Sequence, residues 1–235
     1  MGIKKNCRFV RPNSASVMEE KVLDILVQIK RHQNGSVVDS MQESGIIYKV
    51  NYGVTIPELK QIAQPYKGDH DLAIRLFEED IRECKIIASM IDDSAKVTGV
   101  QIDSWSEQFT NIEIVEQICS NLFWKSDFAL PRSFEWCHDD DNLLQKAGLL
   151  IAGHRASDKS TKDSIFEPYI GIIENIVETD DELISNSAIF TLREIGKRNE
   201  SLKEKVLKAA ERMSESAFGI AAWIGSQLIF EFTEE

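Results

Sequence analysis

Apolar residues recur at helical spacing along most of the chain. Val22, Ile25, Leu26 and Ile29 lie three or four positions apart, behind Ser16, a residue type that caps helices. The same spacing recurs in segments 72–77, 81–91, 112–123, 143–154, 165–177, 184–196 and 202–213. The pattern predicts about ten to twelve helices. Strand-like alternation is scarce, so the predicted fold class is all-α.

Short polar segments separate these helices, at 67–69, 92–94, 138–141 and 179–181. Their spacing predicts paired helices, and a degenerate repeat supports this. Segments 81–91, 143–155 and 187–198 each place a basic or polar pair early in an otherwise apolar helix, with Lys146 and Arg193 47 residues apart. HEAT and armadillo repeats have periods of about 40–47 residues. We therefore expect a HEAT/armadillo-like α-helical solenoid with a concave face, formed by residues 1–235 as a single domain.

The charge balance restricts where a polyanion could bind. The chain has 27 Lys+Arg and 39 Asp+Glu residues, a formal net charge of −12, and 43% apolar residues. Non-specific nucleic-acid binding depends on basic residues that neutralise phosphates, so a nucleic-acid site must be a local patch. The basic N-terminal segment has no apolar leader core, and no apolar run reaches the roughly 18 residues that a membrane span needs. We expect a cytoplasmic protein without a membrane partner.

Other sequence patterns give little support for a cofactor or a metal. The four cysteines, Cys7, Cys84, Cys119 and Cys137, lie far apart and outside any CxxC spacing, which predicts reduced thiols. The run 138–141 combines His and Asp, but adjacent residues rarely converge on one ion, and a turn that caps the next helix is the better interpretation. No phosphate-binding loop or dinucleotide fingerprint occurs. We expect neither metal nor cofactor.

Two segments carry a family resemblance. They are Lys49–Ala63, KVNYGVTIPELKQIA, and Asp80–Ala88, DIRECKIIA, followed later by Leu192-Arg193-Glu194. The chain resembles the DNA alkylation repair proteins, which are HEAT-like-repeat DNA glycosylases, over roughly residues 45–200. Gly53 can adopt backbone conformations closed to other residues, and Pro57 suits a first helical turn. These motifs specify the scaffold more firmly than the chemistry.

The resemblance implies an activity and a binding mode. Members of the family hydrolyse the glycosidic bond of positively charged N3- and N7-alkylated purines in duplex DNA, whose backbone lies in the concave groove, and they need no cofactor. Active members use a Trp, an Asp four residues later and a second Trp from a later helix. A carboxylate can stabilise the oxocarbenium-like sugar that the departing base leaves, and electron-rich rings attract the cationic nucleotide.

In this chain the corresponding positions hold Ile112, Glu116 and Phe190. The resemblance thus makes Glu116 the candidate catalytic residue and Ile112 and Phe190 the candidate nucleotide contacts. Core packing is the alternative for Ile112 and Phe190, and a solvated helix surface is the alternative for Glu116. The loss of the first Trp and the change from Asp to Glu motivate a second hypothesis, a catalytically inactive member that binds altered DNA structure or a protein.

Basic residues on successive repeats are the candidate DNA contacts. They are Lys146, Arg155 and Lys159 on and after one helix, and Arg193 and Lys197 on the next. Arg193 and Lys197 are four residues apart, as are Arg155 and Lys159 if their helix continues that far, so each pair could face one phosphate strand. The alternative is that each pairs with a neighbouring acid, Arg193 for instance with Glu194 or Glu200. His154 belongs to the same basic cluster.

The remaining aromatic and apolar features predict packing. Trp105, Trp124, Trp136 and Trp223 are expected to anchor the repeats, with Trp105 or Trp124 on the groove as the alternative. The apolar segment 217–235 is expected to cap the solenoid or to dock a protein partner.

Overall fold

The computed structural model describes residues 14–179 and 181–233, and these residues form helices and no strand. Three short 3₁₀ helices are η1 (Gln64–Tyr66), η2 (Phe123–Lys125) and η3 (Asp163–Ile165). The thirteen α-helices of the described residues are α1 (Ser14–Arg31), α2 (Gly35–Glu43), α3 (Ile56–Ala63), α4 (His70–Phe77), α5 (Arg82–Ile91), α6 (Gly99–Ser106), α7 (Ile112–Asn121), α8 (Ala129–Trp136), α9 (Asn142–Ser157), α10 (Glu167–Ile176), α11 (Ser185–Gly196), α12 (Glu200–Ser214) and α13 (Gly219–Thr233). The all-α prediction is confirmed, and the helices exceed the ten to twelve expected.

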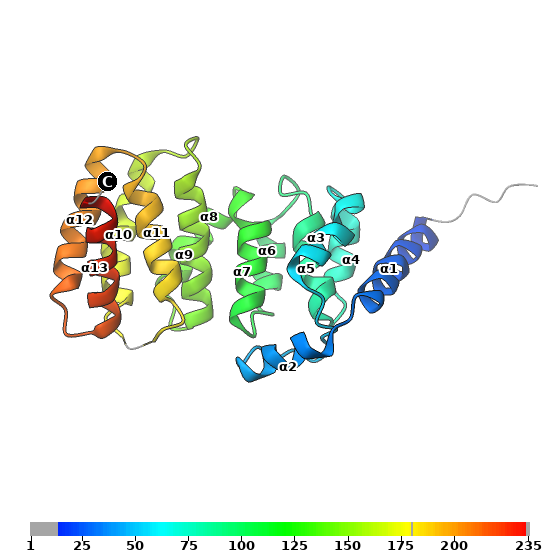
Figure 1. Ribbon diagram of the computed structural model, residues 1–235. Coiled ribbons are helices and arrows are strands. Elements are labelled where there is room, and N and C mark those ends of the chain that lie inside the picture. The colour runs from blue at the N-terminus through cyan, green and yellow to red at the C-terminus, as the bar shows by residue number, and fades with distance from the viewer. Residues whose placement is uncertain (1–13, 180, 234–235) are drawn as a thin grey trace, which may run out of the picture.

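From α3 onward the helices stack in two layers. Each of α3, α5, α7, α9, α11 and α13 contacts the next in this series, and we call this set the odd-helix layer. Behind it, α4 packs on α5, α8 on α9, and α12 on both α11 and α13. Figure 1 shows the helices following one another from α1 at one end of the stack to α13 at the other. No described helix is both long and apolar enough to cross a membrane.

Helix α9 joins two parts of the core. Ala147 and Ile151 belong to a buried cluster that reaches back to α1, whereas Leu149 and Ala152 belong to one that reaches forward to α13. Two glycines allow the close packing. A Cβ at Gly148 would lie 2.7 Å from the Ser133 carbonyl oxygen of α8, and one at Gly153 would lie 2.5 Å from the Phe190 ring of α11. The single-domain interpretation stays a prediction.

Side-chain caps explain several helix starts. The Asp141 carboxylate accepts backbone N–H bonds from Leu143 and Leu144, so the 138–141 turn caps α9 as predicted. Thr55 and Glu58 form a capping box at α3, with Pro57 in the first turn. Helix α1 begins at Ser14, so Ser16 lies inside the helix and its predicted role as the cap was wrong.

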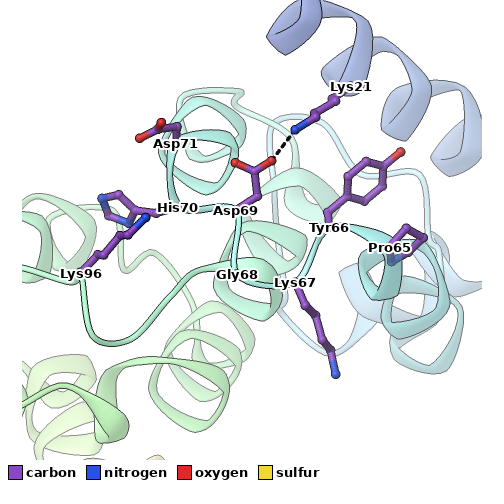
Figure 2. Close-up of a pocket in the computed structure, with 9 residues that line it drawn as sticks. All are labelled: Lys21, Pro65, Tyr66, Lys67, Gly68, Asp69, His70, Asp71 and Lys96. Carbon is purple, nitrogen blue, oxygen red and sulfur yellow. Dashed lines mark hydrogen bonds and ion pairs between the residues drawn. The ribbon is translucent and has the colours of Figure 1, made fainter.

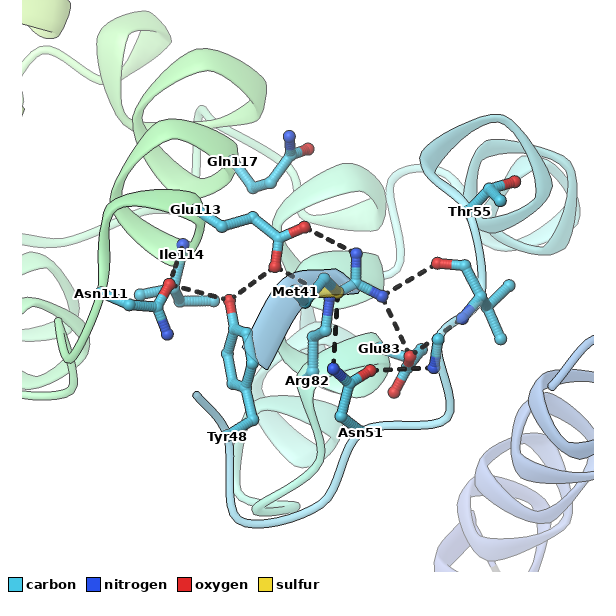
Figure 3. Close-up of polar contacts among 12 residues, drawn as sticks. Met41, Tyr48, Asn51, Thr55, Arg82, Glu83, Asn111, Glu113, Ile114 and Gln117 are labelled. Carbon is cyan, nitrogen blue, oxygen red and sulfur yellow. Dashed lines mark hydrogen bonds and ion pairs between the residues drawn. The ribbon is translucent and has the colours of Figure 1, made fainter. Parts of the chain in front are cut away.

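A polar network holds the segment between α2 and α3 against the stack (Figure 3). The buried Glu83 carboxylate accepts the backbone N–H groups of Tyr52 and Val54, each at 3.2 Å. Arg82, also buried, donates to the Val54 carbonyl at 2.9 Å and to Glu113 of α7 at 2.6 and 2.8 Å. The YGV and RE motifs of the sequence therefore build one structural clamp.

Gly53 lies at the centre of this clamp. Its φ is +70°, a left-handed conformation that L side chains rarely adopt. A Cβ there would lie 2.1 Å from the Asn34 carbonyl oxygen, so both backbone conformation and space require glycine.

Buried thiols and tryptophans fit most of the packing predictions. Cys84, Cys119 and Cys137 are buried free thiols, whereas Cys7 lies outside the described residues. Trp105 and Trp136 are buried in the core as predicted. The prediction for Trp223 was wrong, because 46% of its surface is exposed. Its helix α13 is apolar on nearly every side, so the side that faces the core cannot be predicted from the hydrophobic pattern.

Candidate nucleic-acid interface

Helix α7 carries the first two residues that the family resemblance singles out. The Asn111 side chain caps the helix by accepting the Ile114 N–H, so Ile112 occupies the first helical position and Glu116 lies one turn later. Ile112 is partly buried, and Glu116 exposes 46% of its side chain. The spacing of four residues places both on one side of α7. Glu116 is therefore a carboxylate at the edge of the odd-helix layer with access to solvent.

Lys146 of α9 reaches Glu116 directly. Its ammonium lies 2.9 Å from the carboxylate and also donates to the Leu183 carbonyl, at 3.1 Å, just before α11. The lysine is only 3% exposed. The ammonium of Lys146 thus links α9 to α7 and to the segment before α11. A contact of Lys146 with DNA stays a prediction.

Phe190 of α11 belongs to a row of three partly exposed rings. Its ring centre lies 5.0 Å from that of His154 on α9, edge to face, and the His154 ring stacks at 5.6 Å on Trp124 of η2. Ser120 of α7 fixes two members, because its hydroxyl lies 3.0 Å from His154 Nε2 and its carbonyl accepts Trp124 Nε1–H at 2.9 Å. We call Trp124, His154 and Phe190 the aromatic row. It runs from η2 across α9 to α11, which contact one another in this order.

Sequence reasoning assigned His154 to a basic cluster, and the structure contradicts that charge. Burial and the nearby ammonium of Lys125 both lower the pKa of His154 below its ordinary value of 6.5. The imidazole is therefore neutral at pH 7 and acts as an aromatic surface. Trp124 is partly buried and packs against the core, as the prediction of an anchoring role states, and its alternative place on the groove stays a prediction. Ser120 and Trp124 are four residues apart, but His154 comes from a different helix, so the row can be identified only from the contacts among α7, η2 and α9.

The basic residues in the last turn of α9 and just after it have partners within the protein. Arg155 donates to the Ser126 carbonyl at 2.8 Å and lies 3.4 Å from Asp127. Lys159 donates to the carbonyl groups of Lys197 and Arg198 at 3.1 and 3.3 Å. Because α9 ends at Ser157, the condition for a helical pair of Arg155 and Lys159 is not met.

Arg193 and Lys197 share one acid. Glu231 of α13 lies 2.5 Å from the Arg193 guanidinium and 3.4 Å from the Lys197 ammonium, and Glu194 lies 3.8 Å from Lys197. Arg193 therefore pairs with an acid, as the alternative prediction states, but that acid is Glu231 rather than Glu194 or Glu200. The five predicted DNA contacts do not form a free basic surface in this structure.

The fold resembles a solved structure described as "A new family of proteins related to the HEAT-like repeat DNA glycosylases with affinity for branched DNA structures". The two chains are 14% identical, with a TM-score of 0.74, over 89% of this chain and 94% of that chain. This likeness confirms the predicted HEAT-like repeat fold. No curated protein matches the chain. A family model described as DNA alkylation repair enzyme matches residues 25–221, which is most of the sequence, and the chain therefore belongs to the DNA alkylation repair enzyme family.

Proposed function

We propose that this protein binds double-stranded DNA of altered structure across α7, α9 and α11. The observation that carries the proposal is the aromatic row, three partly exposed rings in which His154 contacts both Trp124 and Phe190. Stacking on an aromatic side chain contributes about 1–3 kcal/mol per base and requires a base that has left its neighbours. Branched, damaged or mispaired DNA offers such bases at the lowest cost of unstacking. Family membership and the branched-DNA affinity of the similar solved structure support this substrate class.

Excision of N3- or N7-alkylated purines is the second candidate function. Glu116 would be the catalytic carboxylate, with Ile112 and Phe190 beside the nucleotide, and its half-exposed side chain favours this role. Two features weaken it. The Lys146 ammonium at 2.9 Å opposes the attraction of the carboxylate for a developing cationic sugar. Ile112 offers no electron-rich ring to a cationic base. Binding is therefore the first candidate.

The proposal includes the four basic residues at the edge of the layer. Arg155, Lys159, Arg193 and Lys197 would exchange their present partners for DNA phosphates. Such an exchange replaces one ionic or hydrogen-bonded partner by another and makes binding depend on salt. We also propose a cytoplasmic location, because three buried free thiols suit a reducing compartment.

Fluorescence anisotropy with labelled DNA tests the binding proposal. The probes are a three-way junction, a duplex with an N7-methylguanine and an unmodified linear duplex of equal length. We expect tighter binding to the altered probes, and a reduced preference in Trp124→Leu and Phe190→Leu. Phe218→Leu, which alters an exposed ring before α13, is the matched control. Equal affinity of the wild type for all three probes would contradict the proposal.

Release of 7-methylguanine or 3-methyladenine from alkylated duplex DNA tests the second candidate. Wild type and Glu116→Gln are compared at equal fractions of folded protein. Release by the wild type and its loss in Glu116→Gln would support a catalytic role. No release alongside intact DNA binding would leave the binding function alone.

A further inference from the structure

Three lysines from separate parts of the chain line one surface cavity. Lys60 comes from α3, Lys67 from the loop after η1, and Lys125 from η2. The cavity has a volume of about 310 Å³, and its other lining residues are Ala63, Gln64, Met90 and Asn121. We call it the lysine pocket. No acidic residue is among the described residues that line it.

The charges of this pocket lack acidic partners. The lysine ion pairs in residues 14–179 and 181–233 involve Lys21, Lys49, Lys85, Lys146, Lys197 and Lys205, and none of the three pocket lysines. Figure 2 shows Lys67 extending away from the nearby ion pair of Lys21 and Asp69. Burial and the proximity of Lys67 lower the pKa of Lys125, which agrees with positive charges that repel one another.

Attraction of cations to helix C-termini explains the position of only one of the three lysines. Lys125 donates to the Asn121 carbonyl at the end of α7, at 2.5 Å, as expected for a cation near a helix C-terminus. That contact accounts for one lysine. Within the described residues, the side chains of Lys60 and Lys67 make no hydrogen bond, yet both line the same cavity. All three lysines are exposed residues, and without an acidic side chain in the pocket lining they form a local positive surface that attracts anions, in a protein with a net charge of −12.

Lys125 also connects the pocket to the aromatic row. Its ammonium lies 5.6 Å from the centre of the Trp124 ring, which stacks on His154. An anion in the pocket would therefore lie next to the first ring of the row. In a nucleotide the phosphate and the base are attached to the same sugar, and single-strand binding surfaces combine a basic groove with stacking rings.

We propose that the lysine pocket binds a backbone phosphate of a nucleic-acid strand and places the adjoining base against Trp124. This inference rests on the proposed DNA-binding function and specifies where the strand lies. In this arrangement the main contact with DNA phosphate lies at the ends of α3, α5 and α7 and not at the basic residues around α11.

The test compares Lys67→Gln/Lys125→Gln with Lys30→Gln/Lys208→Gln. Both double variants remove two positive charges, but Lys30 and Lys208 are exposed residues of α1 and α12 with no ion pair among the described residues. Binding of the three-way junction is measured at several salt concentrations, and urea denaturation checks that each variant is folded. For the pocket variant we expect a slope of log K against log salt that is shallower by about 1 to 2. The control should keep the wild-type slope.

Identical slopes for the two variants, with a wild type that binds DNA, would overturn the pocket assignment and leave the proposed function intact. A wild type that binds no DNA would remove the proposed function. The pocket can then be tested separately by titrating the protein with inorganic phosphate and monitoring the amide NMR signals of residues 60–67 and 121–125. Shifts that are lost in Lys67→Gln/Lys125→Gln would support a free-phosphate site, and their absence in the wild type would overturn the inference.

Discussion

The Lys146 ammonium lies 2.9 Å from the Glu116 carboxylate, although the lysine is almost fully buried and the glutamate is half exposed. The ion pair therefore links Lys146, a buried residue of the core, to Glu116, the candidate catalytic residue by family resemblance. A substitution of Glu116 changes both stability and chemistry. The two effects can be separated by comparing two substitutions.

Glu116→Ala should lower the free energy of unfolding more than Glu116→Gln does. Alanine leaves the buried Lys146 ammonium with only the Leu183 carbonyl, and an unsatisfied buried polar group costs about 1–3 kcal/mol. Glutamine keeps an oxygen that can accept from the ammonium. Urea denaturation at pH 7 measures both variants. Equal stability of Glu116→Ala and wild type would show that the pair contributes nothing to folding.

Glu83→Ala should destabilise the protein severely. The change leaves the backbone N–H groups of Tyr52 and Val54 without an acceptor and removes one counter-charge of the buried Arg82. Removing one partner of a buried ion pair costs about 3–5 kcal/mol. Thermal and urea denaturation measure the loss. Glu43→Ala, at an exposed position of α2, is the control and should stay within about 0.5 kcal/mol of wild type.

Two glycine substitutions separate strain from steric clash. Gly45 and Gly53 have φ values of +75° and +70°, so alanine at either position is strained by about 1–2 kcal/mol. At Gly53 the new Cβ would also clash with backbone, because it would lie 2.1 Å from the Asn34 carbonyl oxygen. At Gly45 the new Cβ would have no such neighbour within 4 Å. Gly53→Ala should therefore cost more than Gly45→Ala in urea denaturation. Equal losses would mean that the α2 segment moves away freely.

The stability of the fold should fall in acid partly through His154. Its pKa is lowered in the folded state, so the unfolded chain binds a proton more readily as the pH falls through 6.5. The stability that its neutral form provides is present above this pH and lost below it. The change in unfolding free energy between pH 7.5 and pH 5 should be smaller in His154→Gln than in wild type. His138→Gln, an exposed control, should behave like wild type.

Local sequence patterns predict the helices and their caps, whereas the side chains that meet at the candidate site are determined by tertiary contacts. The cap at Asp141, the turn at Gly53 and the helical spacing of α9 are short-range features, and each is readable from neighbouring residues. Arg193 finds its acid 38 residues away on α13, where no local rule could place it. Likewise, Lys60, Lys67 and Lys125 come together only because α3, α5 and α7 stack.

The two glycines of α9 have a mechanical consequence. Because Gly148 and Gly153 carry no Cβ, the Ser133 backbone and the Phe190 ring pack closely against α9. This close packing sets the position of α9 between α8 and α11, and with it the spacing between the Trp124 and Phe190 rings, which both contact His154 of α9. We expect a bound duplex to bend or open to match this spacing, so the energy needed to deform each DNA, rather than its base sequence, would select the substrate.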